Sequence, residues 1–161
     1  MARIDTTGAD AVIKQLYKAG QQSGPVAEAM VQAGAVKVRE AWRASAERHG
    51  HRDTGAMIAS ISFPASPSND GGIVSQTIAP KGKDSKGVRN GEKAFVLNYG
   101  TSRIRGSHWV QEAEQEAAPA VAEAMGTIWN SWGQTGSIPV VDVKDPLSGT
   151  GGGRRKHNRK K

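Results

Sequence analysis

The sequence predicts an α+β fold, in which a small antiparallel sheet is packed by long helices and a basic, flexible C-terminal tail follows. Three observations support this prediction. Apolar residues recur at helical spacing near both ends of the chain, apolar and polar residues alternate in its middle, and the last 16 residues contain six basic side chains and no acidic one. We therefore expect a single α+β domain over residues 1–145, and a Gly-rich linker with a basic tail over residues 146–161.

Two helices and a short helical turn are expected in the first part of the chain. Residues 9–19 repeat apolar residues on one helical face, and Gly20 is a natural helix stop. Pro25 is suited to the first turn of a second helix over residues 25–48. A short helical turn then covers residues 53–59. The apolar stripes of the two helices are Val12, Ile13, Leu16 and Tyr17, followed by Val31, Ala35, Val38 and Trp42.

Three strands are expected in the middle of the chain. Residues 61–63 and 73–78 alternate apolar and polar side chains and are separated by a turn at residues 70–72, which predicts a hairpin. Residues 80–93 form a long polar loop. Residues 94–99 are then expected to add a third strand.

A long final helix is expected over residues 109–132. Pro119 removes a backbone donor from this helix and crowds the preceding turn, so we expect a kink or two abutting helices. Residues 138–143 are compatible with a short edge strand. The stripe of the final helix consists of Val110, Ala113, Ala117, Val121, Met125, Ile128 and Trp132.

The composition predicts a thin hydrophobic core. Leu, Ile, Val and Phe together make up about 17% of the 161 residues, below the roughly 20% under which a composition begins to indicate disorder. Such a domain gains stability by burying surface against copies of itself or against neighbours.

The chain contains no Cys, which excludes disulfides, Cys-ligated zinc and thiol catalysis. No apolar run is long enough for a membrane span, and we expect no membrane association.

The sequence contains no motif that is typical of an enzyme. Two histidines at residues 49 and 51 are a weak signal for a metal without a matching carboxylate or thiolate. Neither a nucleophile elbow, an H-E-x-x-H motif nor a P-loop is present. We therefore expect a protein that is not an enzyme and needs no cofactor.

Basic residues are concentrated in two places. Without the tail, the chain carries 16 basic against 15 acidic residues, so that its excess of positive charge lies mainly in the tail. The basic region of the domain is either a solvated surface or a contact for a neighbouring subunit or for DNA phosphates. Its residues are Lys81, Lys83, Lys86, Arg89, Lys93, Arg103 and Arg105. The basic residues of the tail are Arg154, Arg155, Lys156, Arg159, Lys160 and Lys161, and they are expected to bind an acidic partner.

Two short segments resemble a family of small tail components of lambdoid siphophages. Residues 53–61, DTGAMIASI, resemble the family's T-G-x-L-x-x-S-I signature, and residues 94–101, AFVLNYGT, are similar to its strand ending in an aromatic residue, Gly and Thr. His108-Trp109-Val110 follows where the family usually has Pro-Phe-Leu. The resemblance covers about residues 8–132, and the order of the elements carries most of its weight.

The resemblance implies a structural protein of the virion, made in the host cytoplasm. Such a protein forms a ring, six-fold like the tail tube, in the neck between the head and the tail, with double-stranded DNA in its lumen. Its partners would be further copies and the neighbouring neck, connector and tail-tube proteins. A tail terminator ring that caps the tube is an alternative. A stand-alone, non-specific nucleic-acid-binding protein is another.

Overall fold

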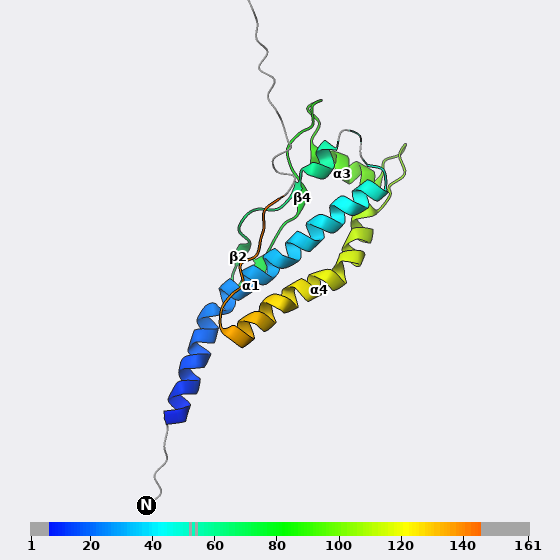
Figure 1. Ribbon diagram of the computed structural model, residues 1–161. Coiled ribbons are helices and arrows are strands. Elements are labelled where there is room, and N and C mark those ends of the chain that lie inside the picture. Colours follow the sequence, from blue (N-terminus) through cyan, green and yellow to red (C-terminus); the bar gives the residue numbers. More distant parts are fainter. Residues whose placement is uncertain (1–6, 52, 54, 146–161) are drawn as a thin grey trace, which may run out of the picture.

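The computed structural model describes residues 7–51, 53 and 55–145. Two long helices dominate it: α1 (Thr7–Arg48) and α4 (Trp109–Thr135), which lie side by side in opposite directions (Figure 1). The remaining elements are α2 (Ala56–Ala59), β1 (Ile61–Ser62), β2 (Ser68–Asp70), β3 (Ile73–Ser75), β4 (Ala79–Pro80) and α3 (Asn90–Tyr99). The predicted α+β class is confirmed.

The first two predicted helices are one continuous helix. Gly20 does not end it, and Pro25 lies inside α1 instead of starting a second helix. A glycine costs only about 1 kcal/mol relative to alanine inside a helix, and one proline removes a single backbone donor. The helix-favouring residues on both sides therefore outweigh these two breakers.

The strands form two small sheets instead of the predicted hairpin. β2 pairs with β3 across the turn at Gly71 and Gly72, whereas β1 pairs with β4. The predicted strand at residues 73–78 therefore ends at Ser75. Residues 138–143 form no strand and run beside α1, where the Arg39 guanidinium donates hydrogen bonds to the carbonyls of Val143 and Lys144.

The prediction of a strand at residues 94–99 is wrong, because this segment belongs to helix α3. Its run of four apolar residues fits either periodicity, and the polar residues decide the outcome. Asn90, Ala94 and Asn98 are buried at four-residue spacing, which is the spacing of one helical face. The side-chain oxygen Oδ1 of Asn98 accepts a hydrogen bond from the backbone N–H of Val110 and so joins α3 to the start of α4.

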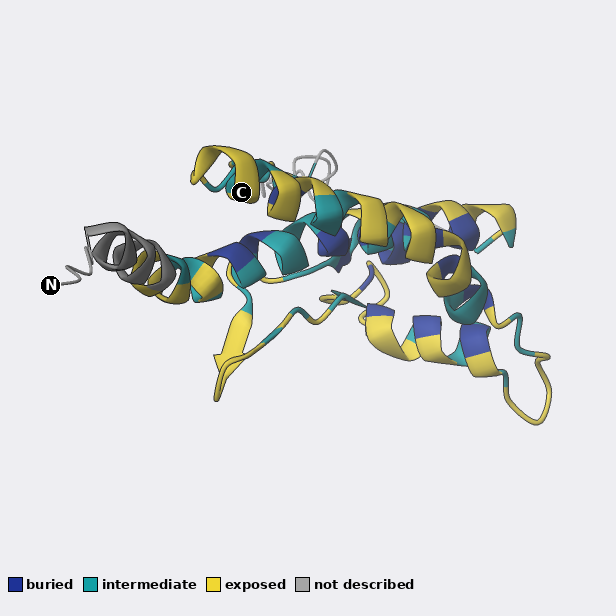
Figure 2. Cartoon of the chain, turned by 90° about the horizontal axis from the view of Figure 1, so that it is seen from below, coloured by how far each residue is buried: buried dark blue, intermediate teal, exposed yellow. Residues whose placement is uncertain are grey.

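The core lies where the end of α1, α2, α3 and the start of α4 meet. Trp109 and Ile61 are completely buried there, together with Ala46, Met57, Ile58 and Ala94. The aromatic rings of Trp42 and Trp109 are packed edge to face at 5.7 Å. Half of the buried apolar residues are alanines, and burial is confined to narrow stripes of the helices (Figure 2). The expectation of a thin core is therefore met in the part of the chain that the structure describes.

A glycine sets the distance between the two long helices. Gly34 of α1 is buried, and a Cβ atom added to it would lie 3.2 Å from Val121 Cγ1 and 3.5 Å from Met125 Sδ of α4.

α4 continues through Pro119 as a single helix that bends in its first half (Figure 1). The expected kink in this helix is therefore observed. None of the helices in the described residues is long and apolar enough to cross a membrane.

Candidate functional site: basic loops and an apolar groove

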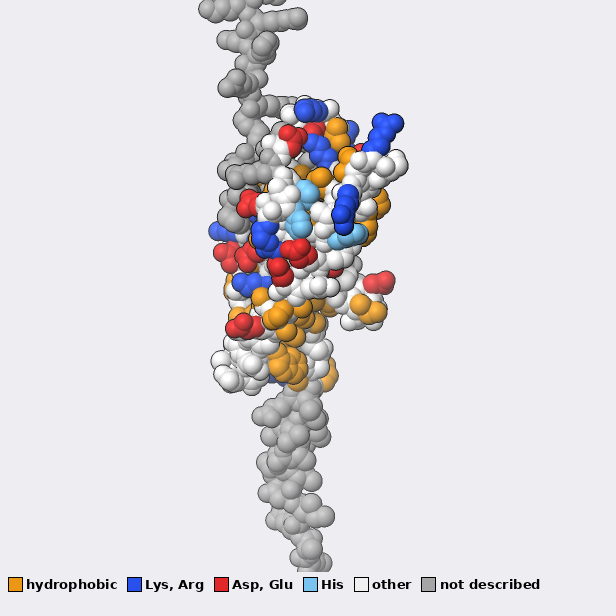
Figure 3. All heavy atoms as spheres, turned by 90° about the vertical axis from the view of Figure 1, so that its right-hand side faces the viewer, with side chains coloured by type: hydrophobic (Ala, Val, Ile, Leu, Met, Phe, Trp, Pro, Cys, Tyr) orange, Lys and Arg blue, Asp and Glu red, His pale blue; other side chains and the backbone are white. Residues whose placement is uncertain are grey.

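Two loops at the ends of α3 carry the basic residues of the domain. Residues 81–89 lead into α3, and residues 100–108 connect it to α4. α3 has ten residues, so the two loops lie within about 15 Å of each other at one end of the molecule. Lys and Arg side chains protrude over this end in the space-filling view (Figure 3). The exposed ones are Lys81, Lys83, Lys86, Arg89, Arg103 and Arg105.

A buried carboxylate organises the first basic loop. Asp84 Oδ1 accepts hydrogen bonds from the backbone N–H groups of Lys86 and Val88, each at 2.9 Å. An isolated antiparallel β-bridge between the backbones of Lys83 and Arg89 closes the loop. The loop backbone therefore turns around Asp84, and the basic side chains point away from it.

Lys93 differs from the other basic residues of this region. Its ammonium group lies 2.5 Å from Asp84 Oδ2 and 3.8 Å from Asp53 Oδ2. The hydrogen bond between the two side chains raises the pKa of Lys93 and lowers the pKa of Asp84, which also accepts the two backbone hydrogen bonds. The structure therefore places Lys93 at the base of the loop, where its charge is neutralised, and not on the exposed basic surface.

The second basic loop depends on glycine at its first position. Gly100 has a φ of +82°, and a Cβ atom there would lie 2.4 Å from the Ile104 carbonyl oxygen. Thr101 Oγ1 accepts hydrogen bonds from the backbone N–H groups of Arg103 and Ile104. The Tyr-Gly-Thr triplet thus forms a tight loop that presents Arg103 and Arg105.

His108 gives this loop a backbone that the usual proline of the resembled family could not adopt. Its φ is +54°, the left-handed region, whereas proline is fixed near −65°. The loop therefore differs from the family pattern at this residue. The other resembled segment is largely a core motif, because Met57, Ile58 and Ile61 are all buried.

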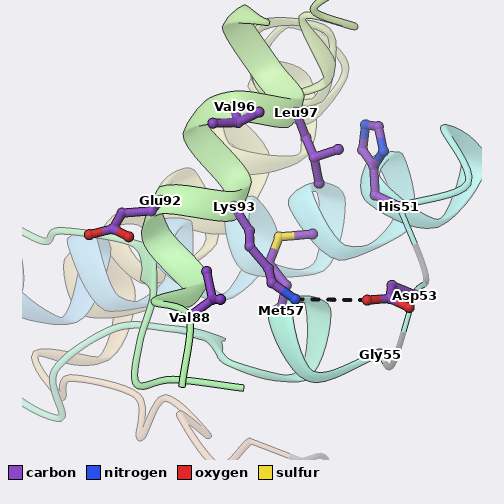
Figure 4. Close-up of a pocket in the computed structure, with 9 residues that line it drawn as sticks. All are labelled: His51, Asp53, Gly55, Met57, Val88, Glu92, Lys93, Val96 and Leu97. Carbon is purple, nitrogen blue, oxygen red and sulfur yellow. Dashed lines mark ion pairs between the residues drawn. The ribbon is translucent and has the colours of Figure 1, made fainter. Parts of the chain in front are cut away.

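An open groove of about 430 Å³ lies between α3 and the segment that follows α1 (Figure 4). Met57, Val88, Val96 and Leu97 form its apolar walls, and His51, Asp53, Glu92 and Lys93 form its polar rim. Sequence reasoning missed this groove, because it assigned residues 94–99 to a strand and so placed these side chains on alternate faces. The four-residue spacing of Val88, Glu92 and Val96 is typical of one helical face and could have indicated the groove.

The histidines are structural within the described residues. His49 Nε2 pairs with Glu112 Oε2 at 2.9 Å, and His51 Nε2 lies 2.9 Å from Ser107 Oγ. Hydrogen bonds from His49 and then from Arg48 lower the pKa of Glu112. Burial, with a smaller contribution from His49, lowers the pKa of His51. No group of three side chains suitable for a metal is found among residues 7–51, 53 and 55–145.

The basic tail lies outside the described residues, but the structure shows how the domain ends before it. Arg43 holds Asp145 with two hydrogen bonds of 2.7 Å and also donates to the carbonyls of Ala59 and Ile61. The side chains of Arg43 and Asp145 are 11% and 15% exposed. This pair fixes the last described residue to the C-terminal part of α1. The tail residues in question are Arg154, Arg155, Lys156, Arg159, Lys160 and Lys161.

No protein-family model matches this chain, and neither the curated proteins nor the solved structures include a match.

Proposed function

We propose that this chain is a structural subunit of a tailed-phage neck, which assembles into a ring that completes the tail or joins it to the head. The DNA passes through the lumen of this ring. The role is mechanical, without catalysis or a cofactor. The proposal combines the resemblance of two sequence segments with one structural observation, the exposure of large apolar side chains from Tyr17 to Val140.

This exposure carries the argument for assembly. Six of the exposed large apolar side chains are more than half exposed and are spread from α1 to α4, and Val140 beyond α4 is 98% exposed. The core beneath them is half alanine. Large apolar surfaces on a thinly packed protein are typical of subunits that bury them against neighbours. The more exposed residues are Tyr17, Ile73, Phe95, Tyr99, Ile104 and Trp129.

The basic loops are suited to an anionic neighbour of the ring. Six exposed Lys and Arg residues lie on the two loops at the ends of α3. Contacts of this kind attract phosphates without reading their sequence, and they weaken as the salt concentration rises. We propose that these residues face the DNA or an acidic adjacent subunit.

Two other functions are compatible with parts of this description. A tail terminator ring would use the same fold and the same exposed surfaces at the end of the tail tube. A stand-alone nucleic-acid-binding protein would use the loops and the tail, but its domain outside the tail is close to neutral, with 16 basic and 15 acidic residues. The neck ring accounts for the apolar exposure as well as for the charge.

Electron microscopy of the purified assembled protein tests the proposal. We expect a ring with a central opening wide enough for duplex DNA. Labelled protein in assembled particles should lie at the junction of head and tail, whereas a label at the end of tails without heads would indicate a terminator. Tight binding of DNA by free monomers at physiological salt, without rings, would instead support the nucleic-acid-binding protein.

A further inference from the structure

The N-terminal part of α1 extends beyond the rest of the molecule. α1 contains 42 residues and α4 contains 27, which correspond to about 63 and 40 Å of helix. Trp132, near the end of α4, donates a hydrogen bond to Gln22 of α1 at 3.0 Å. The α1 residues before Gln22 therefore project past the end of α4 (Figure 1). We name residues 7–21 the projecting helix.

The projecting helix has an amphipathic sequence. Val12, Ile13, Leu16 and Tyr17 recur at helical spacing, as they do in helices that pack on a partner. Tyr17 is 69% exposed. Together with the exposed Tyr17, this sequence pattern favours a partner outside its own protomer.

The groove beside α3 offers the complementary surface. Its walls are apolar, it is open to solvent, and Val88 on its wall is 41% exposed (Figure 4). Its long side is the helix α3, and its volume of about 430 Å³ leaves room for several apolar side chains. An amphipathic helix that inserts its apolar face into such a groove is a common mode of protein recognition.

The two surfaces of one chain cannot reach each other. His51 and Asp53, on the rim of the groove, follow directly after the end of α1 at Arg48. Tyr17 lies 31 residues earlier in the same unbroken helix, which corresponds to about 46 Å. α1 itself therefore holds the projecting helix and the groove at opposite ends of the molecule.

We propose that the projecting helix of one copy lies in the groove beside α3 of a second copy. The inference rests on the proposed ring and names the joint between its subunits. Each copy carries one projecting helix and one groove, so every contact leaves one of each free for the next copy. Such a head-to-tail contact closes into a ring when the rotation between subunits permits it. A symmetric pairing of two projecting helices would leave both grooves empty.

Cysteine cross-linking tests this joint without interference, because the chain has no cysteine of its own. One tagged chain carries Tyr17→Cys and a second, differently tagged chain carries Val88→Cys. After co-expression, a short thiol cross-linker should produce dimers that contain both tags. The matched control replaces the second chain with Ile73→Cys, a position on β3 that is more exposed than Val88, and should give at least tenfold fewer mixed dimers.

Two further results would contradict the proposed joint. One is the absence of mixed dimers from Tyr17→Cys and Val88→Cys in a preparation that contains assembled protein. The other is efficient cross-linking of Tyr17→Cys chains to one another. In either case a ring seen by microscopy would leave the proposed function intact. Mixed dimers in open filaments without rings would support the joint and contradict the ring.

A second pair of variants tests the same contact without cross-linking. Tyr17→Asp places a charge on the projecting helix, outside the core, and should shift most of the protein from the assembled to the monomeric mass. Ile73→Asp is the control and should leave the assembled mass unchanged. Unchanged helical circular dichroism shows that both variants fold. An assembled Tyr17→Asp protein would overturn the proposal.

Discussion

At the scale of single residues, one carboxylate determines how the first basic loop is presented. Asp84 joins two backbone N–H groups of residues 81–89 to the ammonium group of Lys93 in α3. Its lowered pKa means that these interactions stabilise the fold above the ordinary pKa of about 4 and are lost as the pH falls through the lowered value. At neutral pH the loop is therefore anchored by a fully ionised side chain.

Asp84→Asn should loosen this loop without unfolding the domain. We expect amide hydrogen exchange at Lys86 and Val88 to become roughly tenfold faster at neutral pH, because a charged acceptor is replaced by a weaker neutral one. The rates of amide hydrogen exchange in helices α1 and α4 should not change. Asp70→Asn on the exposed strand β2 is the control. Equal exchange rates in Asp84→Asn and the wild type would show that the carboxylate does not hold the loop.

His51 makes the stability of the domain depend on pH. Burial lowers its pKa below the value of about 6.5 in the unfolded chain. The unfolded state therefore binds the proton more readily, and stability should fall as the pH is lowered from about 7 through 6.5 and further toward the folded pKa. Above this range the contribution is constant.

His51→Gln removes this titration and should flatten the pH dependence. The variant keeps a group that can donate to Ser107 Oγ, as His51 does. Urea unfolding between pH 7.5 and 5 should show a smaller loss of stability than in the wild type. An identical slope in both proteins would show that His51 is not the source of the dependence.

At the scale of secondary-structure elements, the sequence was informative wherever one periodicity dominated. The stripe of the final helix predicted α4 and its bend correctly. α3 was missed, because residues 94–97 are all apolar and fit a strand as well as a helix. The basic loops were recognised from their composition, whereas the groove depends on α3 and could not be predicted without it. Gly20 and Pro25 were interpreted as breakers, although α1 continues through both residues.

Gly34→Leu tests how closely α1 and α4 approach each other. The new side chain would collide with Val121 and Met125, since a Cβ atom alone lies 3.2 Å from Val121 Cγ1. We expect a loss of about 2 kcal/mol in the free energy of unfolding, which is typical of overpacked sites. Gly126→Leu on α4 is the control, because no atom lies within 4 Å of its added Cβ. A loss of the same size in both variants would contradict close packing at Gly34.

At the scale of the whole molecule, the charges of the tail are separate from the fold. Deletion of residues 154–161 removes six basic residues and leaves every described contact in place. We expect the unfolding midpoint to stay the same, while binding to a purified neck or tail partner weakens at low salt and differs less from full length at high salt. Equal joining of heads to tails by both proteins at low and high salt would show that the tail has no role in assembly.

The central claim is that this chain works as a ring and not as a monomer. We propose that neighbouring copies cover its exposed apolar side chains and so stabilise its thin core. The most direct test is the mass of the wild-type protein over a concentration series, alone and with its head and tail partners. We predict a closed assembly of about 102 kDa, six times the mass of 17.0 kDa, with monomers only at the lowest concentrations. A stable monomer of 17.0 kDa at every concentration, also in the presence of the partners, would contradict the account.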